Sequence, residues 1–218
     1  MQYKKNSEED IMEDLYKYEK ELYKENYKLI GGVDEVGRGP LVGPVVAACC
    51  VLPSDFYLEG LTDSKKLSEK KRDIFFEYIK EHAIAYGVGV VSPERMDEIN
   101  IYEASREAMI IAIKEVQKQI PLEVVLVDAM PLNIDIKSIS IIHGDALSIS
   151  IAAASVIAKV TRDKMMYELD KKYPEYGFAS HKGYPTKKHI EAINKYGLIE
   201  GYRKTYGPVK KVLEEKNE

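Results

Sequence analysis

The 218 residues are 45% hydrophobic and 31% charged, with a net charge of −4, so the chain can bury one sizeable core, or a core with a small appendage. No uncharged apolar run reaches the roughly eighteen residues that a membrane helix needs, and residues 1–9 are too polar for a secretory signal. We therefore expect a cytoplasmic protein with no membrane partner. Cys49 and Cys50 are adjacent in an apolar run, which favours reduced thiols in the core over a disulfide or a metal site.

The charge is distributed unevenly along the chain. Residues 156–211 carry 13 Lys or Arg against 6 Asp or Glu, whereas residues 1–155 carry 18 against 27. A basic C-terminal quarter after an acidic body suits a nucleic-acid backbone that approaches a cation-filled carboxylate site. A solvated lysine-rich surface is the alternative.

The first predicted element is an amphipathic helix over residues 8–25. Ser7 to Asp10 resembles a capping box, and apolar residues then repeat at helical spacing from Ile11 to Leu22. The acidic character of this helix argues against membrane binding. We expect residues 1–28 to form an extension that docks on the rest of the protein and is not needed for its chemistry.

Two strands are predicted next, near residues 29–33 and 45–51, with Asp34 and Glu35 at the end of the first. Neighbouring side chains on a strand point to opposite faces, so these two acids can share an ion only where the strand breaks. The glycines that follow allow such a break. A dinucleotide-binding loop is excluded because the last glycine is wrongly spaced and prolines obstruct the required helix. Without further context, two adjacent acids would indicate a solvated turn.

The segment 61–72 leads into a helix that Ser68 can cap and that runs to about Glu81. Ser64, Lys65 and Lys66 lie where a loop meets a helix N-terminus, which favours contact with phosphate over simple solvation. A third strand is predicted over residues 83–91. A helical region then starts at residues 92–94, continues through 103–118, and ends before Pro121.

A buried strand over residues 123–128 ends abruptly in Asp128, and open α/β sheets place ligands at such ends. A short strand over 138–142 follows, and then a long helix over 148–171. Asp145 stands just before that helix, where an acid is usually a cap or a partner of the helix dipole.

The C-terminal part, residues 172–218, begins with a loop rich in glycine, proline and tyrosine, followed by a helix over 187–196. Tyr184 lies beside lysines in that loop and could stack on a sugar or base, or simply pack. His181 and His189 are far from any cysteine, so we interpret them as structural or solvent-facing rather than as zinc ligands.

Several motifs together resemble type 2 ribonuclease H (ribonuclease HII) over about residues 29–211. They include Asp-Glu-Val-Gly-Arg-Gly-Pro-Leu-x-Gly-Pro-Val from residue 34, Asp-Ser-Lys-Lys-Leu from 63, Gly-Asp-x-x-x-x-x-Ile-Ala-Ala-Ala-Ser-Val-Ile-Ala-Lys-Val-Thr-Arg-Asp from 144 and Gly-Tyr-Arg-Lys-Thr-Tyr-Gly-Pro-Val from 201. The resemblance implies a ribonuclease H-like α/β fold, a mixed sheet flanked by helices, over residues 29–171. Residues 172–218 would form a helical, basic substrate-binding extension.

The resemblance also implies the site. Its catalytic and metal-binding carboxylates would be Asp34, Glu35, Asp128 and Asp145. Four hard oxygen ligands suit Mg²⁺ or Mn²⁺, with two ions in the expected mechanism. The expected substrate contacts are Gly37, Arg38, Gly39, Ser64, Lys65, Lys66 and Tyr184. Tyr202 stands where the family usually has His, which leaves the role of that position open.

The implied activity is an endoribonuclease that leaves a 3′-hydroxyl and a 5′-phosphate. Its partners would be RNA/DNA hybrids and duplex DNA containing single ribonucleotides, cut on the 5′ side of the ribonucleotide by a protein that we expect to be a monomer. One alternative is a type 3 ribonuclease H, which Arg38 between two glycines argues against. The other is a non-catalytic nucleic-acid-binding module, which the four carboxylates disfavour because acids repel phosphate unless a metal bridges them.

Overall fold

The computed structural model describes residues 15–215. Its strands are β1 (Ile30–Val36), β2 (Val45–Val51), β3 (Ala85–Val91), β4 (Val124–Asp128) and β5 (Lys137–Ile141). Its α-helices are α2 (Lys17–Lys24), α3 (Glu69–His82), α4 (Pro93–Gln117), α5 (Ile149–Lys172), α6 (Phe178–His181), α7 (Lys187–Tyr196) and α8 (Gly207–Glu215). Three short 3₁₀ helices are η1 (Ser64–Lys66), η2 (Gly144–Ala146) and η3 (Pro174–Tyr176).

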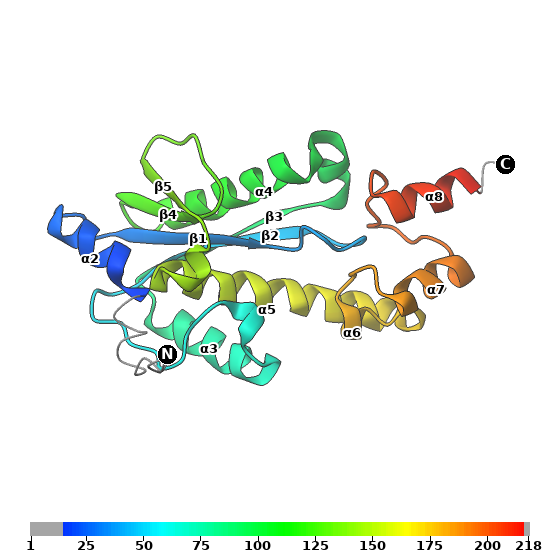
Figure 1. Ribbon diagram of the computed structural model, residues 1–218, viewed down its shortest axis with the longest axis horizontal. Coiled ribbons are helices and arrows are strands. Elements are labelled where there is room, and N and C mark those ends of the chain that lie inside the picture. Colours follow the sequence, from blue (N-terminus) through cyan, green and yellow to red (C-terminus); the bar gives the residue numbers. More distant parts are fainter. Residues whose placement is uncertain (1–14, 216–218) are drawn as a thin grey trace, which may run out of the picture.

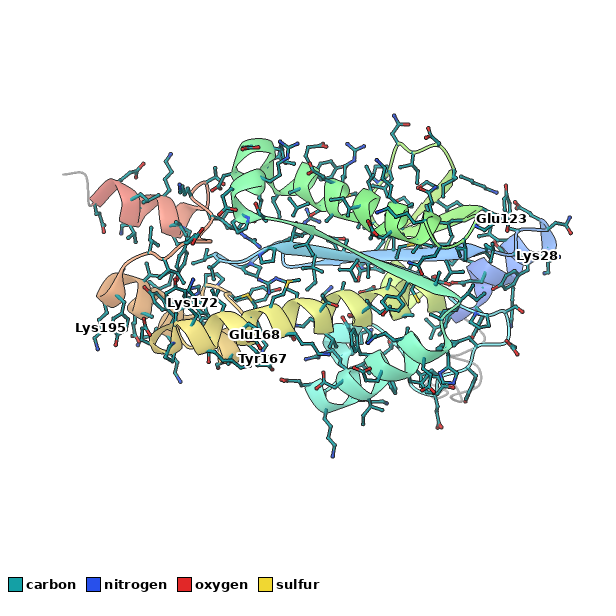
Figure 2. The ribbon with its side chains drawn as sticks, turned by 180° about the vertical axis from the view of Figure 1, so that it is seen from behind. Lys28, Glu123, Tyr167, Glu168, Lys172 and Lys195 are labelled. Atoms are coloured by element: carbon teal, nitrogen blue, oxygen red, sulfur yellow. The ribbon has the colours of Figure 1, made fainter. Side chains whose placement is uncertain are left out.

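The five strands form one mixed sheet in the order β3-β2-β1-β4-β5. The first three strands are antiparallel neighbours, whereas β4 lies parallel to β1 and β5 parallel to β4. The carboxylate of Glu123 accepts hydrogen bonds from the backbone N–H groups of Lys28 and Leu29, each at 2.7 Å (Figure 2). This contact ties the start of β1 to the start of β4, so the two parallel strands run side by side toward the same edge.

Helices cover both faces of the sheet, with α4 on one face and α5 with α3 on the other (Figure 1). Each face has its own apolar cluster. Strand valines pack on the alanines of α4 on one face, and small residues of β2 pack on the alanines of α5 and the phenylalanines of α3 on the other. The alanines of α5 keep its axis close to the sheet. Helix α5 approaches the sheet most closely at Gly32 of β1, where an added Cβ would lie 2.0 Å from the backbone of Ser150. Only glycine allows α5 to cross β1 at that distance.

The C-terminal extension lies beyond the sheet, at the far end of α5 (Figure 1). Here η3, α6, α7 and α8 pack around their own apolar cluster, which includes Leu41 and Val42 from the loop between β1 and β2. Val42 also forms an isolated antiparallel bridge with Tyr202. The extension is therefore joined directly to the glycine-rich loop.

The predicted fold class is confirmed, and the sequence also predicted most element positions. The expected helix 8–25 is observed as α2, while residues 8–14 lie outside the described residues. Helix α4 is kinked at Asn100, whose φ is 68° and whose side chain caps the second half by accepting from the N–H groups of Tyr102 and Glu103. Cys49 and Cys50 are free and buried in β2, as expected. Within residues 15–215, no helix is long and apolar enough to cross a membrane.

Candidate active site

Three carboxylates from separate segments converge at one edge of the sheet. Asp34 lies on β1, Asp128 ends β4, and Asp145 lies in η2 directly before α5. Each offers an oxygen that lies within 4.8 Å of the others, and Asp34 is only 6% exposed. The register explains the meeting, because Val33 pairs with Val127 and so brings the next residues, Asp34 and Asp128, side by side.

The third carboxylate is held against the other two by backbone contacts. Gly144 donates its N–H to Asp128 Oδ1 at 2.7 Å, and the carbonyl of Gly144 accepts from the N–H groups of Leu147 and Ser148. These bonds close the turn that carries Asp145. An acid in front of a helix is usually a cap, but the side chain that caps α5 is Ser148, whose hydroxyl accepts from Ile151 N–H. The Asp145 carboxylate is therefore left to face Asp34 and Asp128.

The cluster concentrates negative charge in a poorly solvated place. Burial raises the pKa of Asp34 well above its usual value, and the nearby carboxylates of Glu35, Asp128 and Asp145 raise it further. The pKa of Asp145 is also raised, first by burial and then by Asp63 and Asp128, although the Lys65 ammonium opposes this shift. Carboxylates in this arrangement repel one another unless a cation lies between them.

Glu35 is not part of this group of three. Its Oε1 pairs with the Arg38 guanidinium at 3.4 Å, and its Oε2 is buried with no hydrogen-bond partner among the described residues. Burial is the main reason that the pKa of Glu35 rises to about 7, with Arg38 lowering it and Asp128 raising it. The negative charge of Asp128 therefore affects Glu35, although Glu35 lies outside the group of three. The assignment of Glu35 as a fourth metal ligand stays a prediction.

The glycine-rich loop between β1 and β2 is fixed by two buried arginines. Arg203 donates to the carbonyls of Gly37, Arg38 and Gly43. Arg162, from α5, donates to the carbonyls of Val42, Pro44 and Lys182. Both arginines are fully buried, and burial lowers the pKa of each. The loop carbonyls are turned inward, and Gly37 adopts a φ of 97°, which glycine accepts without strain.

The sequence assigned no role to Arg162 or Arg203. Both stand inside motifs that carry the resemblance, but a basic residue in a basic segment gives no sign that it is buried. Arg203 stands between Tyr202 and Lys204 in a mixed polar segment, so the sequence carries no signal that sets it apart from a surface residue.

Tyr184 lies beside the same loop. Its side chain is 42% exposed, and its ring approaches Gly39 so closely that an added Cβ there would lie 3.2 Å from Cε1. The preceding residue, Gly183, accepts a hydrogen bond from Leu41 N–H at 2.8 Å. Tyr184 is therefore a surface aromatic held against the loop rather than a core residue.

The second basic segment also reaches the carboxylates. Lys65 Nζ lies 3.8 Å from Asp145 Oδ2, while Ser64 is buried and its N–H donates to Ser155 Oγ at 3.3 Å. Burial would lower the pKa of Lys65, but the carboxylates of Asp34, Asp63 and Asp145 outweigh it and raise the pKa. Lys66 is exposed. Its predicted contact with substrate stays a prediction, as do those of the other loop residues.

His189 and Tyr202 form a buried pair behind the Tyr184 loop. The Tyr202 hydroxyl donates to His189 Nε2 at 2.8 Å, and His189 Nδ1 donates to the Tyr184 carbonyl at 2.9 Å. His181 stacks on His189 at 4.4 Å between ring centroids. These histidines are structural, as predicted, and Tyr202 supports the loop from behind.

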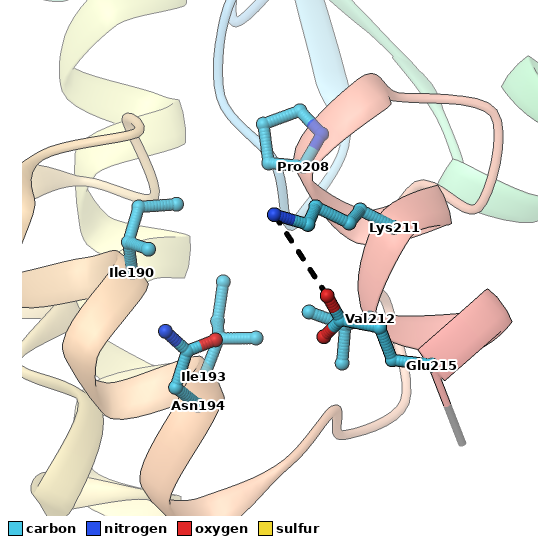
Figure 3. Close-up of a pocket in the computed structure, with 7 residues that line it drawn as sticks. All are labelled: Ile190, Ile193, Asn194, Pro208, Lys211, Val212 and Glu215. Carbon is cyan, nitrogen blue, oxygen red and sulfur yellow. Dashed lines mark ion pairs between the residues drawn. The ribbon is translucent and has the colours of Figure 1, made fainter. Parts of the chain in front are cut away.

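A hollow of about 450 Å³ lies between α7 and α8, away from the carboxylates. It is lined by Ile190, Ile193, Asn194, Pro208, Lys211, Val212 and Glu215 (Figure 3). Lys211 and Glu215 form an ion pair across one turn there, at 3.8 Å. No predicted site residue contributes to this hollow, so it gives no support for a small-molecule pocket at the site.

Comparison with known proteins agrees with this geometry. The family model described as Ribonuclease HII matches residues 31–206, which include every carboxylate of the site. The chain belongs to the ribonuclease HII family. It is 54% identical to ribonuclease HII of Bacillus cytotoxicus over 213 residues, covering 98% of this chain and 82% of that one. It is 55% identical to ribonuclease HII of Bacillus mycoides over 201 residues, covering 92% and 77%. The predicted family, and with it an endoribonuclease, is confirmed.

Solved structures share the fold. Ribonuclease H2 from Pyrococcus horikoshii superposes with a TM-score of 0.73 at 28% identity, covering 87% of this chain and 99% of that one. A Bst-RNase HIII solved in complex with Mn²⁺ gives a TM-score of 0.65 at 17% identity, covering 86% and 70%, and at that identity the likeness is one of fold alone. The family match therefore favours type 2 over the type 3 alternative.

Proposed function

We propose that this ribonuclease HII hydrolyses the phosphodiester on the 5′ side of a ribonucleotide, both in RNA/DNA hybrids and at single ribonucleotides embedded in duplex DNA. The observation that carries the proposal is the meeting of Asp34, Asp128 and Asp145 within 4.8 Å, beside a glycine-rich loop. Cleavage would leave a 3′-hydroxyl and a 5′-phosphate. In the cytoplasm, this activity would serve ribonucleotide removal and RNA primer processing.

The residues at the site fit divalent cations. Three carboxylates face one another, and nearby Glu35 has a buried oxygen without a hydrogen-bond partner among the described residues. This oxygen-only donor set suits Mg²⁺ or Mn²⁺. Asp34, Asp128 and Asp145 would hold the metal directly, and Glu35 would complete the site. When two ions are bound, they supply the Lewis-acid charge that favours attack of water on the phosphate and departure of the 3′-oxygen.

The remaining residues would select and hold the substrate. With the loop carbonyls fixed by Arg203, the backbone around Gly37 and Gly39 is available to a 2′-hydroxyl, the group that distinguishes RNA from DNA. Tyr184 would stack on the next sugar, where a deoxyribose presents a flat apolar face. Ser64, Lys65 and Lys66 would contact phosphates.

The basic C-terminal quarter would add contacts to the phosphate backbone of the duplex. Lys172, at the end of α5, and Lys195, on α7, lie at the end of the molecule that carries the extension (Figure 2). Lysines spread over such a surface bind the phosphate backbone without reading sequence. We infer that a single chain binds one duplex and that no second copy is needed.

A panel of matched duplexes tests the proposed function. The duplexes are one with a single embedded ribonucleotide, one RNA/DNA hybrid and one all-DNA duplex of the same sequence, each incubated with the protein and Mg²⁺. We expect cleavage of the first two and none of the third, with the single-ribonucleotide duplex cut on the 5′ side of that residue. Cleavage of the hybrid alone would contradict the proposed substrate choice.

A further inference from the structure

A buried carboxylate connects the N-terminal helix to the candidate active site. Glu19 lies on α2, outside the residues that the family model matches, and its side chain is only 1% exposed. Its Oε1 accepts from the hydroxyl of Ser148 at 2.6 Å and from the N–H of Ser150 at 3.1 Å. Its Oε2 is buried and has no hydrogen-bond partner within the described part of the chain.

The placement of this side chain is costly if its only purpose is to dock α2. Burying a carboxylate carries a desolvation penalty, and burial raises the pKa of Glu19. Leu22, one turn further along the same helix, already anchors α2 in an apolar cluster with Ile151. An apolar residue at position 19 would serve docking without the penalty. The hydrogen bonds to α5 are the feature that an apolar residue could not provide.

Those hydrogen bonds end at the turn that carries Asp145. Ser148 caps α5 by accepting from Ile151 N–H at 3.2 Å while it donates to Glu19. The N–H of Ser148 in turn donates to the Gly144 carbonyl at 2.9 Å. Because Gly144 and Asp145 belong to the same 3₁₀ turn, the position of Ser148 constrains the position of the Asp145 carboxylate.

We propose that Glu19 is a positioning residue that holds Ser148, and through it the turn of Asp145, so that this carboxylate meets Asp34 and Asp128. The inference rests on the proposed role of Asp145 as a metal ligand. It gives α2 a part in the chemistry, beyond the docking role that the sequence suggested. Glu19 itself touches neither metal nor substrate.

The test compares Glu19→Ala and Glu19→Gln with the matched control Glu21→Ala, an exposed glutamate on the same helix. The readout is Mn²⁺ affinity measured by titration calorimetry on the full chain without substrate. We expect Glu19→Ala to weaken Mn²⁺ binding about 10-fold or more, within the range for residues that orient metal ligands. Glu19→Gln keeps an accepting oxygen for Ser148 and should restore most of that affinity. Glu21→Ala should match the parent protein.

A second readout separates positioning from a general loss of stability. Amide hydrogen exchange at residues 144–151 of the metal-free protein should be faster in Glu19→Ala and close to that of the parent in Glu19→Gln. In cleavage assays at limiting metal, Glu19→Ala should lower kcat and leave KM for the duplex unchanged, and raising the metal concentration should restore kcat.

A variant of the hydrogen-bond donor, Ser148, keeps the test decisive if Glu19→Ala does not fold. Ser148→Ala should weaken Mn²⁺ binding to a similar extent, and the double variant should be no weaker than the more affected single one, because both act through one contact. The inference is overturned if folded Glu19→Ala or Ser148→Ala binds Mn²⁺ like the parent.

Asp145→Asn is the reference that separates the two claims. If it weakens Mn²⁺ binding while Glu19→Ala does not, the positioning role of Glu19 fails and the metal site stands. If Asp145→Asn binds Mn²⁺ as the parent does, the assignment of Asp145 fails and the role of Glu19 fails with it.

Discussion

The N–H of Gly144 donates a 2.7 Å hydrogen bond to Oδ1 of Asp128, which ties the turn before α5 to the end of β4. Asp128 therefore has a structural hydrogen-bond partner, and it also belongs to the group of three carboxylates. The same side chain orders the site and contributes charge to it. These two roles can be separated by substitution.

Asp128→Asn should keep the hydrogen bond that orders the site and lose the negative charge. The amide oxygen can still accept from Gly144, so we expect a folded protein with parent-like hydrogen exchange near residues 144–147. Loss of the charge should lower cleavage by more than about 100-fold, the upper end of the effect of changing a residue that only supports a ligand. Asp128→Ala should lose cleavage and also speed exchange in that turn. Retained cleavage in Asp128→Asn would remove Asp128 from the catalytic group.

Asp34→Asn should stabilise the metal-free protein while it removes activity. Burial and neighbouring carboxylates raise the pKa of Asp34 above its usual 3.8, so the native state binds more protons than the unfolded chain as the pH rises beyond that value. Stability is therefore lost with rising pH, and Asn removes this penalty while it can still accept from Glu35 N–H.

Thermal unfolding in EDTA checks this expectation. The Tm of Asp34→Asn should exceed that of the parent, by a larger margin at about pH 7 than at about pH 5, and added Mg²⁺ should reverse the order by stabilising only the parent. A lower Tm for Asp34→Asn in EDTA at both pH values would show that the Asp34 carboxylate does not destabilise the metal-free protein.

Tyr184→Ala should impair cleavage at a single ribonucleotide selectively. The exposed ring next to Gly39 is placed to stack on the sugar that follows the ribonucleotide. Stacking of an aromatic side chain on a base, the nearest comparison, is worth about 1–3 kcal/mol. We expect a loss of roughly 10-fold or more under single-turnover conditions, with a smaller loss on an RNA/DNA hybrid. Tyr184→Phe keeps the ring and is the control. Equal rates for the Ala variant and the parent on both substrates would return Tyr184 to a packing role.

His189 should make stability fall on mild acidification. Its pKa is lowered from 6.5 to about 4, mainly by burial and also by the adjacent His181, although the hydrogen bond to the Tyr184 carbonyl opposes the shift. Between about pH 4 and pH 6.5 the unfolded chain binds more protons at His189 than the native state does. The free energy of unfolding therefore rises with pH from about 4 to about 6.5, and above about 6.5 His189 no longer changes it.

His189→Gln supplies the comparison, because Gln can accept from Tyr202 and donate to the Tyr184 carbonyl without titrating. Urea unfolding across this pH range should show a shallower pH dependence for the variant than for the parent. Parallel curves would mean that His189 gains a proton as easily in the native state as in the unfolded one.

Much of the site could be predicted because two of its carboxylates lie at or near the ends of strands that the sequence predicts. Asp34 and Asp128 each close an apolar run, and adjacent parallel strands bring such residues together at one edge. The fold class followed from the same alternation of strands and helices. Strand alternation predicts that Glu35 points away from Asp34, and β1 does continue through both residues. The pairing of Glu35 with Arg38 could not be predicted, because it depends on the loop beyond β1.

The remaining features depend on tertiary burial, which local sequence does not show. Glu19 belongs to an acidic, amphipathic segment that predicts a solvated face, yet it is buried against the start of α5. Arg203 looks like another basic surface residue, but its guanidinium fits the inward carbonyls of a loop 160 residues earlier. Long-range hydrogen bonds to backbone atoms leave no pattern in a single sequence.

The central claim is that Asp34, Asp128 and Asp145 together hold the metal that cleaves next to a ribonucleotide. Its most direct test is end-mapped cleavage of a duplex with one embedded ribonucleotide in Mg²⁺, by the parent and by Asp34→Asn at equal occupancy of the duplex. We predict a single nick on the 5′ side of the ribonucleotide with a 3′-hydroxyl for the parent, and no nick for the variant. A variant that nicks at the parent's rate, or a parent that cuts elsewhere in the duplex, would contradict the account.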